Sequence, residues 1–138
     1  MLEGLFNSTT IPVMEQVVNF TEARQNILAG NIANLDTPGY KVRDLSVDDF
    51  QQRLDHAIKS RRQPDVYRSP GDMASGDEPS EMAQVSKNPR NILYHDKSNV
   101  GVEYQVTEMV KNHIQHNMAL AIMSNQFKLL QTAISERV

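Results

Sequence analysis

The sequence predicts a mainly α-helical fold in which two long terminal helices pack as an antiparallel, coiled-coil-like pair. The first observation is that apolar residues recur at steps of three and four between about Val106 and Ile134, as in a helix that lies along another helix. The second is a similar pattern behind Pro12. The third is a middle region poor in apolar residues, which predicts a short third helix within an irregular segment.

The N-terminal helix is expected from about Pro12 to Asn34. Ser8, Thr9 and Thr10 precede Pro12, and hydroxyl residues followed by Pro are a helix-start signal. At 1.5 Å per residue the helix would be roughly 35 Å long. Its apolar positions are Val13, Val17, Phe20 and Ile27, with Met14, Val18, Leu28, Ile32 and Leu35 beside them.

A turn is expected directly after this helix, in the stretch Leu35–Tyr40. Pro38 removes a backbone donor and biases the residue before it away from helical angles. Pro followed by Gly39 at the two central positions predicts a type II turn, because the second position needs a positive φ. Lys41 to Asp44 should continue as extended chain.

The middle of the chain is expected to hold one short amphipathic helix, from Val47 to about Ser60. Residues 61–91 are rich in Pro, Gly, Ser and Asp, so they are predicted to form an irregular surface excursion. Ile92 to Tyr94 would be a short extended piece. The alternation from Val100 to Val106 is typical of a strand and predicts an extended lead-in to the C-terminal helix, which would begin between Val102 and Val106.

The C-terminal helix carries more apolar surface than one partner helix can cover. Two further rows beside its main seam are also largely apolar, and a chain of 138 residues has little else to bury them with. The sequence therefore favours assembly over catalysis. The seam comprises Val106, Met109, His113, His116, Leu120, Met123, Phe127, Leu130 and Ile134.

Composition excludes several other classes of function. The net charge is −3, whereas a nucleic-acid binder normally shows a basic excess. There is no Cys, and no apolar run reaches the roughly 18 residues of a membrane span. The first residues lack the basic start and apolar stretch of a cleaved signal peptide, so we expect a cytosolic protein or one exported without such a signal.

Two distant segments resemble one known family. The run Asn31-Ile32-Ala33-Asn34-Leu35-Asp36-Thr37-Pro38-Gly39-Tyr40-Lys41 is similar to the N-terminal signature of bacterial flagellar rod and hook proteins, the axial family. Glu108-Met109, Asn112, Met118-Ala119-Leu120 and Phe127-Lys128-Leu129-Leu130 resemble the C-terminal helix of the same family. The short length and the missing large middle domain look most like its proximal rod subunits.

The resemblance implies a structural subunit of the flagellar proximal rod, without enzymatic activity, cofactor or metal. Such a subunit would assemble helically with copies of itself and with sister rod proteins, near the inner-membrane ring and the export gate. It would lie in the periplasmic part of the basal body, exported through the flagellar type III apparatus without a cleaved signal, and would bind no nucleic acid and no small-molecule substrate.

Residues 1–40 and 100–138 would form one axial domain around a variable middle region, 41–99. The expected assembly interface comprises Asn31, Asn34, Thr37, Pro38, Gly39, Tyr40, Met109, Asn112, Leu120, Met123, Phe127, Leu130 and Ile134.

Two other hypotheses remain open at this stage. A cytosolic helical adaptor or chaperone-like binding module would use the same apolar rows on one partner. A metal-dependent enzyme could use His113 and His116, which share a helix face, together with His56 or His95. Because no acidic partner is close on that face, we favour a structural role for these histidines.

Overall fold

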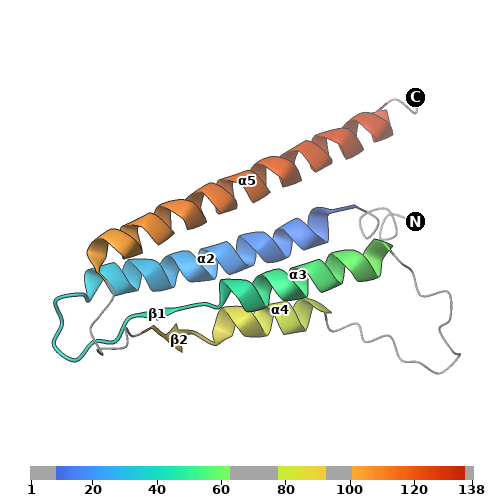
Figure 1. Cartoon of the computed structure of the whole chain (residues 1–138). Helices are drawn as coiled ribbons and strands as arrows, with labels where there is room; N and C mark the ends of the chain where they lie inside the picture. Colours follow the sequence, from blue (N-terminus) through green and yellow to red (C-terminus); the bar gives the residue numbers. More distant parts are fainter. Residues whose placement is uncertain (1–8, 63–77, 93–100, 136–138) are drawn as a thin grey trace, which may run out of the picture.

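The computed structural model describes residues 9–62, 78–92 and 101–135. This part of the chain forms four helices and two very short strands, arranged as in Figure 1. The numbering of the elements follows that figure. They are α2 (Ile11–Ala33), β1 (Arg43–Asp44), α3 (Val47–Arg62), α4 (Glu78–Lys87), β2 (Arg90–Asn91) and α5 (Val102–Ser135).

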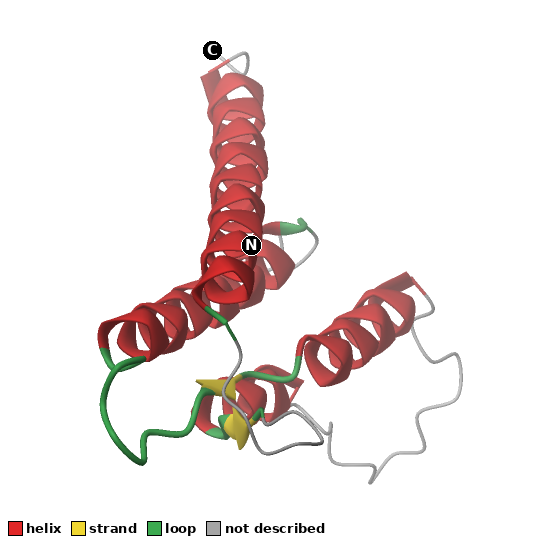
Figure 2. Ribbon diagram, turned by 60° about the vertical axis from the view of Figure 1, so that its left-hand side comes forward, coloured by secondary structure: helices red, strands yellow, loops and turns green. Residues whose placement is uncertain are grey.

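The predicted pair of long terminal helices is confirmed. In Figure 1, α2 and α5 run in opposite directions, lie together where α5 begins and separate toward the end of α5. Helix α2 is the central element of the described chain, because α5, α4, α3 and β1 all pack against it. Figure 2 shows α3 and α4 grouped on one side, with α5 rising away from them.

The start and end of α2 follow the predicted signals with one change. Thr10 occupies the cap position without a side-chain cap bond, and the Ile11 N–H donates instead to Oγ1 of Thr9 at 3.4 Å. At the other end, the Asn34 amide donates to the Gly30 carbonyl oxygen at 2.8 Å. This side-chain bond satisfies a carbonyl group at the helix terminus.

The turn after α2 has the predicted geometry. The Tyr40 N–H donates to the Thr37 carbonyl oxygen at 3.1 Å, which closes a four-residue turn with Pro38 and Gly39 at its centre. Gly39 has a φ of +79°, the value that a type II turn needs at this position. The turn leads the chain back along α2 into β1.

The apolar core lies between α2, α3 and α4, on the side of α2 away from most of α5. The Phe20 and Phe50 rings are stacked with centroids 3.9 Å apart, and Leu45, Ala57 and Val85 complete the buried cluster. This core fixes α3 and α4 against α2 through burial of apolar surface.

One prediction for the middle region is wrong, and a second is only partly tested. Helix α4 lies inside the stretch predicted to be irregular, because Val85 finds apolar partners in the core and Pro79 stands in the first turn of the helix, where its missing N–H costs no bond. The second strand is Arg90–Asn91, paired antiparallel with Arg43–Asp44, so it precedes the predicted extended piece. Of that piece, residues 93 and 94 lie outside the described residues.

Helix α5 begins at Val102, the earliest start that was predicted, so no extended lead-in continues beyond that residue. The Gln105 N–H donates to the Gly101 carbonyl oxygen at 3.2 Å, so the first helical turn closes immediately after Gly101. The alternation of Val102, Tyr104 and Val106 finds no partner strand among the described residues, and all three side chains are exposed. Across the described helices, none combines the length and hydropathy that a membrane crossing requires.

Candidate assembly surface and its polar support

Near the start of α5 the face that meets α2 is mainly polar. Gln105, Asn112 and Ala119 are the three buried residues of α5 within the described range, and they recur at steps of seven. The predicted apolar seam supplies only part of the contact with α2: His116 contacts Thr21, and Met109, Met123 and Leu130 are half-buried. Of its members, Val106, Leu120, Phe127 and Ile134 are exposed. The reason is that α2 presents polar side chains here, which polar side chains of α5 can satisfy.

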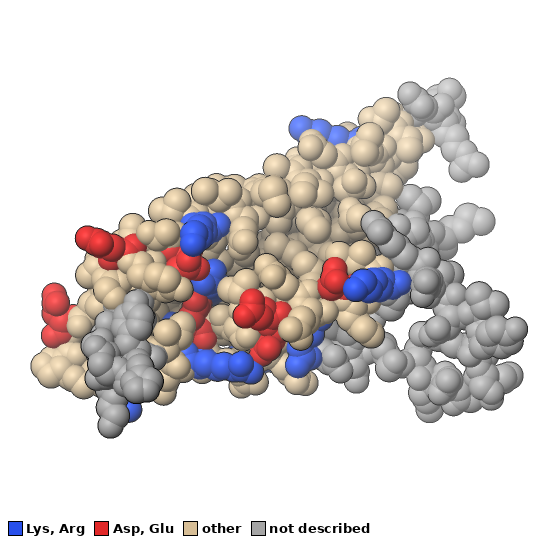
Figure 3. Space-filling view, in the orientation of Figure 1, with Lys and Arg blue, Asp and Glu red and all other residues tan. Residues whose placement is uncertain are grey.

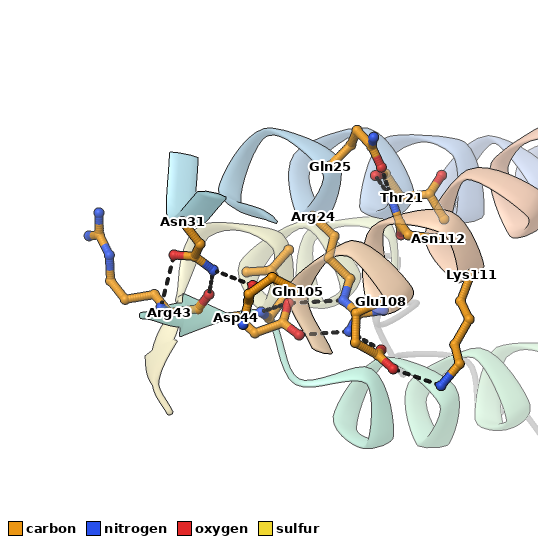
Figure 4. A network of polar contacts seen from close by, with 11 residues as sticks. Thr21, Arg24, Gln25, Asn31, Arg43, Asp44, Gln105, Glu108, Lys111 and Asn112 are labelled. Atoms are coloured by element: carbon orange, nitrogen blue, oxygen red, sulfur yellow. Dashed lines mark hydrogen bonds and ion pairs between the residues drawn. The ribbon is translucent and has the colours of Figure 1, made fainter. Parts of the chain in front are cut away.

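An arginine on α2 anchors this polar contact. The Arg24 guanidinium donates to both carboxylate oxygens of Asp44, at 2.9 and 2.6 Å, and to Oε2 of Glu108 at 2.8 Å. Figure 4 shows that Arg24 thereby joins α2 to β1 and to α5 at one point. Its side chain is 5% exposed, so the pairs are shielded from water and from salt.

The charges in this network shift one another's pKa. Burial lowers the pKa of Arg24, but its hydrogen bonds and its proximity to Asp44 and Glu108 outweigh burial, and the pKa is raised. The pKa of Glu108 is lowered by its hydrogen bond from Lys111, against the opposing effect of burial, and further by Arg24. The Lys111 Nζ to Glu108 Oε1 distance is 2.8 Å.

A second polar cluster ties the end of α2 to the turn. Asn31 is fully buried. Its Oδ1 accepts from the Arg43 N–H at 3.1 Å and from the Tyr40 hydroxyl at 3.0 Å. Its Nδ2 donates to the Arg43 carbonyl oxygen and to Oε1 of Gln105. One side chain thus holds α2, the turn, β1 and α5 together (Figure 4).

A third cluster lies about two turns beyond Gln105 along α5. The Asn112 Nδ2 donates to the Thr21 carbonyl oxygen at 2.8 Å and to Oε1 of Gln25 at 2.9 Å. Oγ1 of Thr21 lies 2.9 Å from Nδ1 of His116. Oδ1 of Asn112 is buried and finds no hydrogen-bond partner among the described residues. As residue numbers increase along α2, the residues that they contact on α5 have decreasing numbers. These bonds therefore fix the antiparallel register of the two helices.

Large apolar side chains are exposed on several sides of α5 beyond its contact with α2, and we call this surface the outer face. Lys128 is the single Lys, Arg, Asp or Glu in the stretch 112–135. Figure 3 accordingly shows few charged atoms along α5. The large apolar side chains of the outer face that are exposed are Val102, Tyr104, Val106, Val110, Ile114, Met118, Leu120, Phe127, Leu129 and Ile134.

The predicted interface residues fall into three groups in the structure. Exposed to solvent are Thr37, Pro38, Gly39, Leu120, Phe127 and Ile134. Half-buried are Asn34, Tyr40, Met109, Met123 and Leu130. Asn31 and Asn112 are buried and use their side chains within the chain. Sequence patterns do not identify Arg24, Asp44, Gln105 and Glu108 as network residues, since no spacing signal links positions so far apart.

The histidines do not form a metal site among the described residues. No three His, Asp or Glu side chains converge in the ranges 9–62, 78–92 and 101–135. His113 is exposed, and His116 contacts Thr21. His95 lies outside the described residues.

An antiparallel helix pair with polar bonds inside and an uncharged apolar face outside defines a structural subunit that other helices can cover. The sequence profile of a family described as "Flagella basal body rod protein" matches residues 19–41. That stretch holds Arg24, Asn31 and the turn. Flagellar basal body rod protein FlgB of Bacillus subtilis is 27% identical over 128 residues, 93% of this chain and 95% of that protein.

Two further relatives carry the same name. The protein of Salmonella typhimurium is 29% identical over 121 residues, 83% of this chain and 84% of that protein. That of Aquifex aeolicus is 29% identical over 129 residues, 92% of this chain and 94% of that protein. Over most of its length the chain is therefore a homologue of flagellar basal body rod proteins, as the predicted resemblance implied.

Proposed function

We propose that the chain is a structural subunit of the bacterial flagellar basal body rod, in its proximal part, and that it carries no chemistry of its own. The subunit assembles helically through its terminal helices to build the drive shaft for motility. The observation that carries the proposal is the outer face of α5, where Ile114, Leu129 and Ile134 are each more than 60% exposed.

Burying this much exposed apolar surface against another molecule is energetically favourable. Contiguous apolar patches on soluble proteins mark sites of association. A helical polymer forms when each subunit presents a surface that matches a different surface on the next copy. The outer face of α5 and the exposed turn at Thr37–Gly39 lie on different parts of the subunit and provide two such surfaces.

The partners follow from the same family resemblance. We propose copies of this chain and sister rod proteins as the neighbours along the shaft, with the inner-membrane ring and the export gate at its base. The subunit would lie in the periplasmic part of the rod and would reach it without a cleaved signal peptide. The relatives, which are named as flagellar basal body rod proteins, support this location.

The interface residues divide between contact and support in this proposal. Leu120, Phe127 and Ile134 contact a neighbouring subunit directly, as do Pro38 and Gly39 in the turn. The buried members, Asn31 and Asn112, act from inside by fixing α5 on α2, so that the outer face is presented in one orientation.

A charge on the outer face tests the function. Phe127→Glu should leave the free energy of unfolding of the monomer within about 0.5 kcal/mol, because the side chain is exposed. It should nevertheless abolish swarming and remove the subunit from isolated basal bodies, while export of the chain continues. Gln131→Glu, at an exposed polar position of the same helix, is the matched control and should retain motility.

Normal motility of Phe127→Glu would overturn the proposal. A closed one-to-one or dimeric complex of the wild-type chain, in place of a helical polymer or a ring-attached shaft, would instead favour the adaptor.

A further inference from the structure

An apolar groove lies where α2, α3 and α5 meet. It encloses about 230 Å³. Its walls include Val17 of α2, Phe50 and Leu54 of α3, and Met118 and Ile122 of α5. None of the residues that line it is charged. Met118 is 60% exposed, so the groove is open to solvent along α5.

The chain contains a segment whose chemistry fits this groove. Residues 1–8 lie outside the described residues and read MLEGLFNS. Leu2, Leu5 and Phe6 stand at i, i+3 and i+4, which places them on one face of a helical turn. Glu3 is the one charged side chain in this segment. An apolar and nearly uncharged peptide matches a groove that offers no partner for a charge.

The tether between the segment and the groove is short enough. The chain bends at Thr9 and Thr10, directly before α2. Four residues from Phe6 to Thr10 span up to about 13 Å when extended. Val17, seven residues beyond Thr10, lies about 10 Å along the helix axis. Phe6 can therefore reach back to the second turn of α2, where Val17 lines the groove.

We propose that residues 1–8 dock in this groove of their own chain, with Leu5 and Phe6 between α3 and α5. The docked segment shields Met118 and Ile122 in the free subunit, and a neighbouring subunit displaces it on assembly. The role in assembly rests on the proposed rod function, but the docking itself is a property of the monomer. A short tether gives the segment a millimolar effective concentration, which exceeds the concentration of any free copy in dilute solution.

Disulfide cross-linking of the purified monomer tests this contact, and the chain is suited to it because it contains no Cys. Glu3→Cys combined with Gln115→Cys leaves the apolar anchors intact, and Gln115 is an exposed residue that lines the groove. The seven residues from Glu3 to Thr10 span up to about 23 Å, enough to reach Gln115, which lies near Thr21. Glu3→Cys with Asn117→Cys is the matched control. Asn117 is exposed at almost the same height on α5, but it points about 200° away around the helix axis.

At about 10 µM protein, mild oxidation should link Glu3→Cys to Gln115→Cys within one chain, with cross-linked monomer exceeding dimer by about 100-fold. The control pair should remain largely unlinked. Adding Leu5→Ser and Phe6→Ser to the Gln115 pair should reduce its cross-link to the control level.

Equal cross-linking of the two pairs would overturn the proposal, as would a cross-link that survives loss of the apolar anchors. Disulfide-linked dimers alone would also overturn it and would assign the groove to a second copy. The measurement needs no rod, so its failure is distinguishable from failure of the proposed function, which the motility of Phe127→Glu decides.

Discussion

The two faces of α5 differ from those of a typical helix in a globular protein, because polar side chains are buried against α2 and large apolar side chains are exposed. The inner face, against α2, buries Gln105 and Asn112 among hydrogen-bonding partners. The outer face exposes Ile114, Leu129 and Ile134 to solvent. In most surface helices the apolar stripe faces the core and the polar stripe faces water. The reversal shows that α5 is positioned within the subunit by polar bonds, while its apolar surface remains available for association.

The difference matters because polar and apolar contacts respond differently to a shift in the register of the two helices. Apolar side chains can slide past one another at small cost, whereas a buried polar group without its partner costs about 1–3 kcal/mol. Polar residues at helix contacts are known to fix register at some expense of stability. The bonds of Arg24, Asn31 and Asn112 should therefore set one orientation of α5 and so one orientation of its outer face.

The largest expected effect comes from breaking the inner face at Arg24. Arg24→Ala leaves the buried carboxylate of Asp44 without its cation and leaves Glu108 with Lys111 alone, and loss of one partner of a buried pair costs about 3–5 kcal/mol. The free energy of unfolding, measured by urea denaturation, should fall by about that amount. The control Arg90→Ala removes an ion pair whose arginine is 70% exposed, and it should cost about 1 kcal/mol or less.

An equal effect of Arg24→Ala and Arg90→Ala would contradict the view that the inner face holds the subunit together. Arg24→Lys offers a milder comparison. This variant keeps the positive charge but loses the bidentate hydrogen bonding to Asp44. Its free energy of unfolding should lie between those of the wild type and Arg24→Ala.

The next largest effect should come from the turn that carries β1 to the inner face. Gly39→Val forces a β-branched residue into a positive φ, which costs about 1–3 kcal/mol. No atom lies within 4 Å of the added Cβ, so the expected loss is backbone strain alone. Gly39→Asn, whose side chain tolerates this conformation, should lose less in a thermal unfolding experiment. Identical melting curves for Gly39→Val and the wild type would show that the strain is relieved elsewhere.

Sequence periodicity was sufficient to predict the long helices, because burial on at least one face leaves a pattern at helical spacing. The same signal failed for α4, in which Val85 is the buried core residue among the side chains that the structure describes. Proline and glycine around it suggested an irregular chain, yet a proline in the first turn is compatible with a helix. A short helix with few apolar residues is too weakly patterned to be distinguished from a loop.

The inner face could not be predicted from the sequence for a different reason. Gln105 and Asn112 have the composition of a solvent-exposed row, and an apolar row was the natural choice for the contact with α2. Arg24 forms ion pairs with residues that lie 20 and 84 positions away in the sequence. No local sequence pattern predicts pairs at such separations. The signature around Asn31 and Gly39 was recognisable by resemblance, but the bonds that explain Asn31 became visible only in the structure.

Acid should weaken the inner face selectively, by less than the loss of Arg24. The pKa of Glu108 is lowered in the folded chain, by Lys111 first and then by Arg24, against burial. Its stabilisation is therefore complete above the unfolded pKa, near 4.3, and is lost as the pH falls through the lower folded value. The wild type should lose more stability between pH 5 and pH 3 than Glu108→Gln does. Parallel pH profiles of the two proteins would contradict a role for this carboxylate.

The smallest effect on stability is the most informative, and it concerns Asn112. Its Oδ1 is already buried without a hydrogen-bond partner among the described residues. The double variant Gln25→Leu/Asn112→Leu removes this unpaired acceptor, the bonded pair with Gln25 and the bond to the Thr21 carbonyl oxygen, which lies within α2 and takes part in its backbone ladder. Replacing both partners of a hydrogen bond by apolar groups is close to neutral, and we expect a change within about 1 kcal/mol. Asn112→Ala alone leaves Gln25 without its partner and opens a void, and it should cost more.

If the polar bonds fix the orientation of α5 on α2, the double variant should fold with nearly unchanged stability. It should nevertheless not be incorporated into the rod. Its amide NMR spectrum should show more than one set of α5 signals, because two apolar positions permit more than one register. A single set of signals together with normal swarming would mean that the remaining bonds of Arg24 and Asn31 fix α5 by themselves. The specificity of the inner face would then reside entirely in the half of the contact nearest the turn.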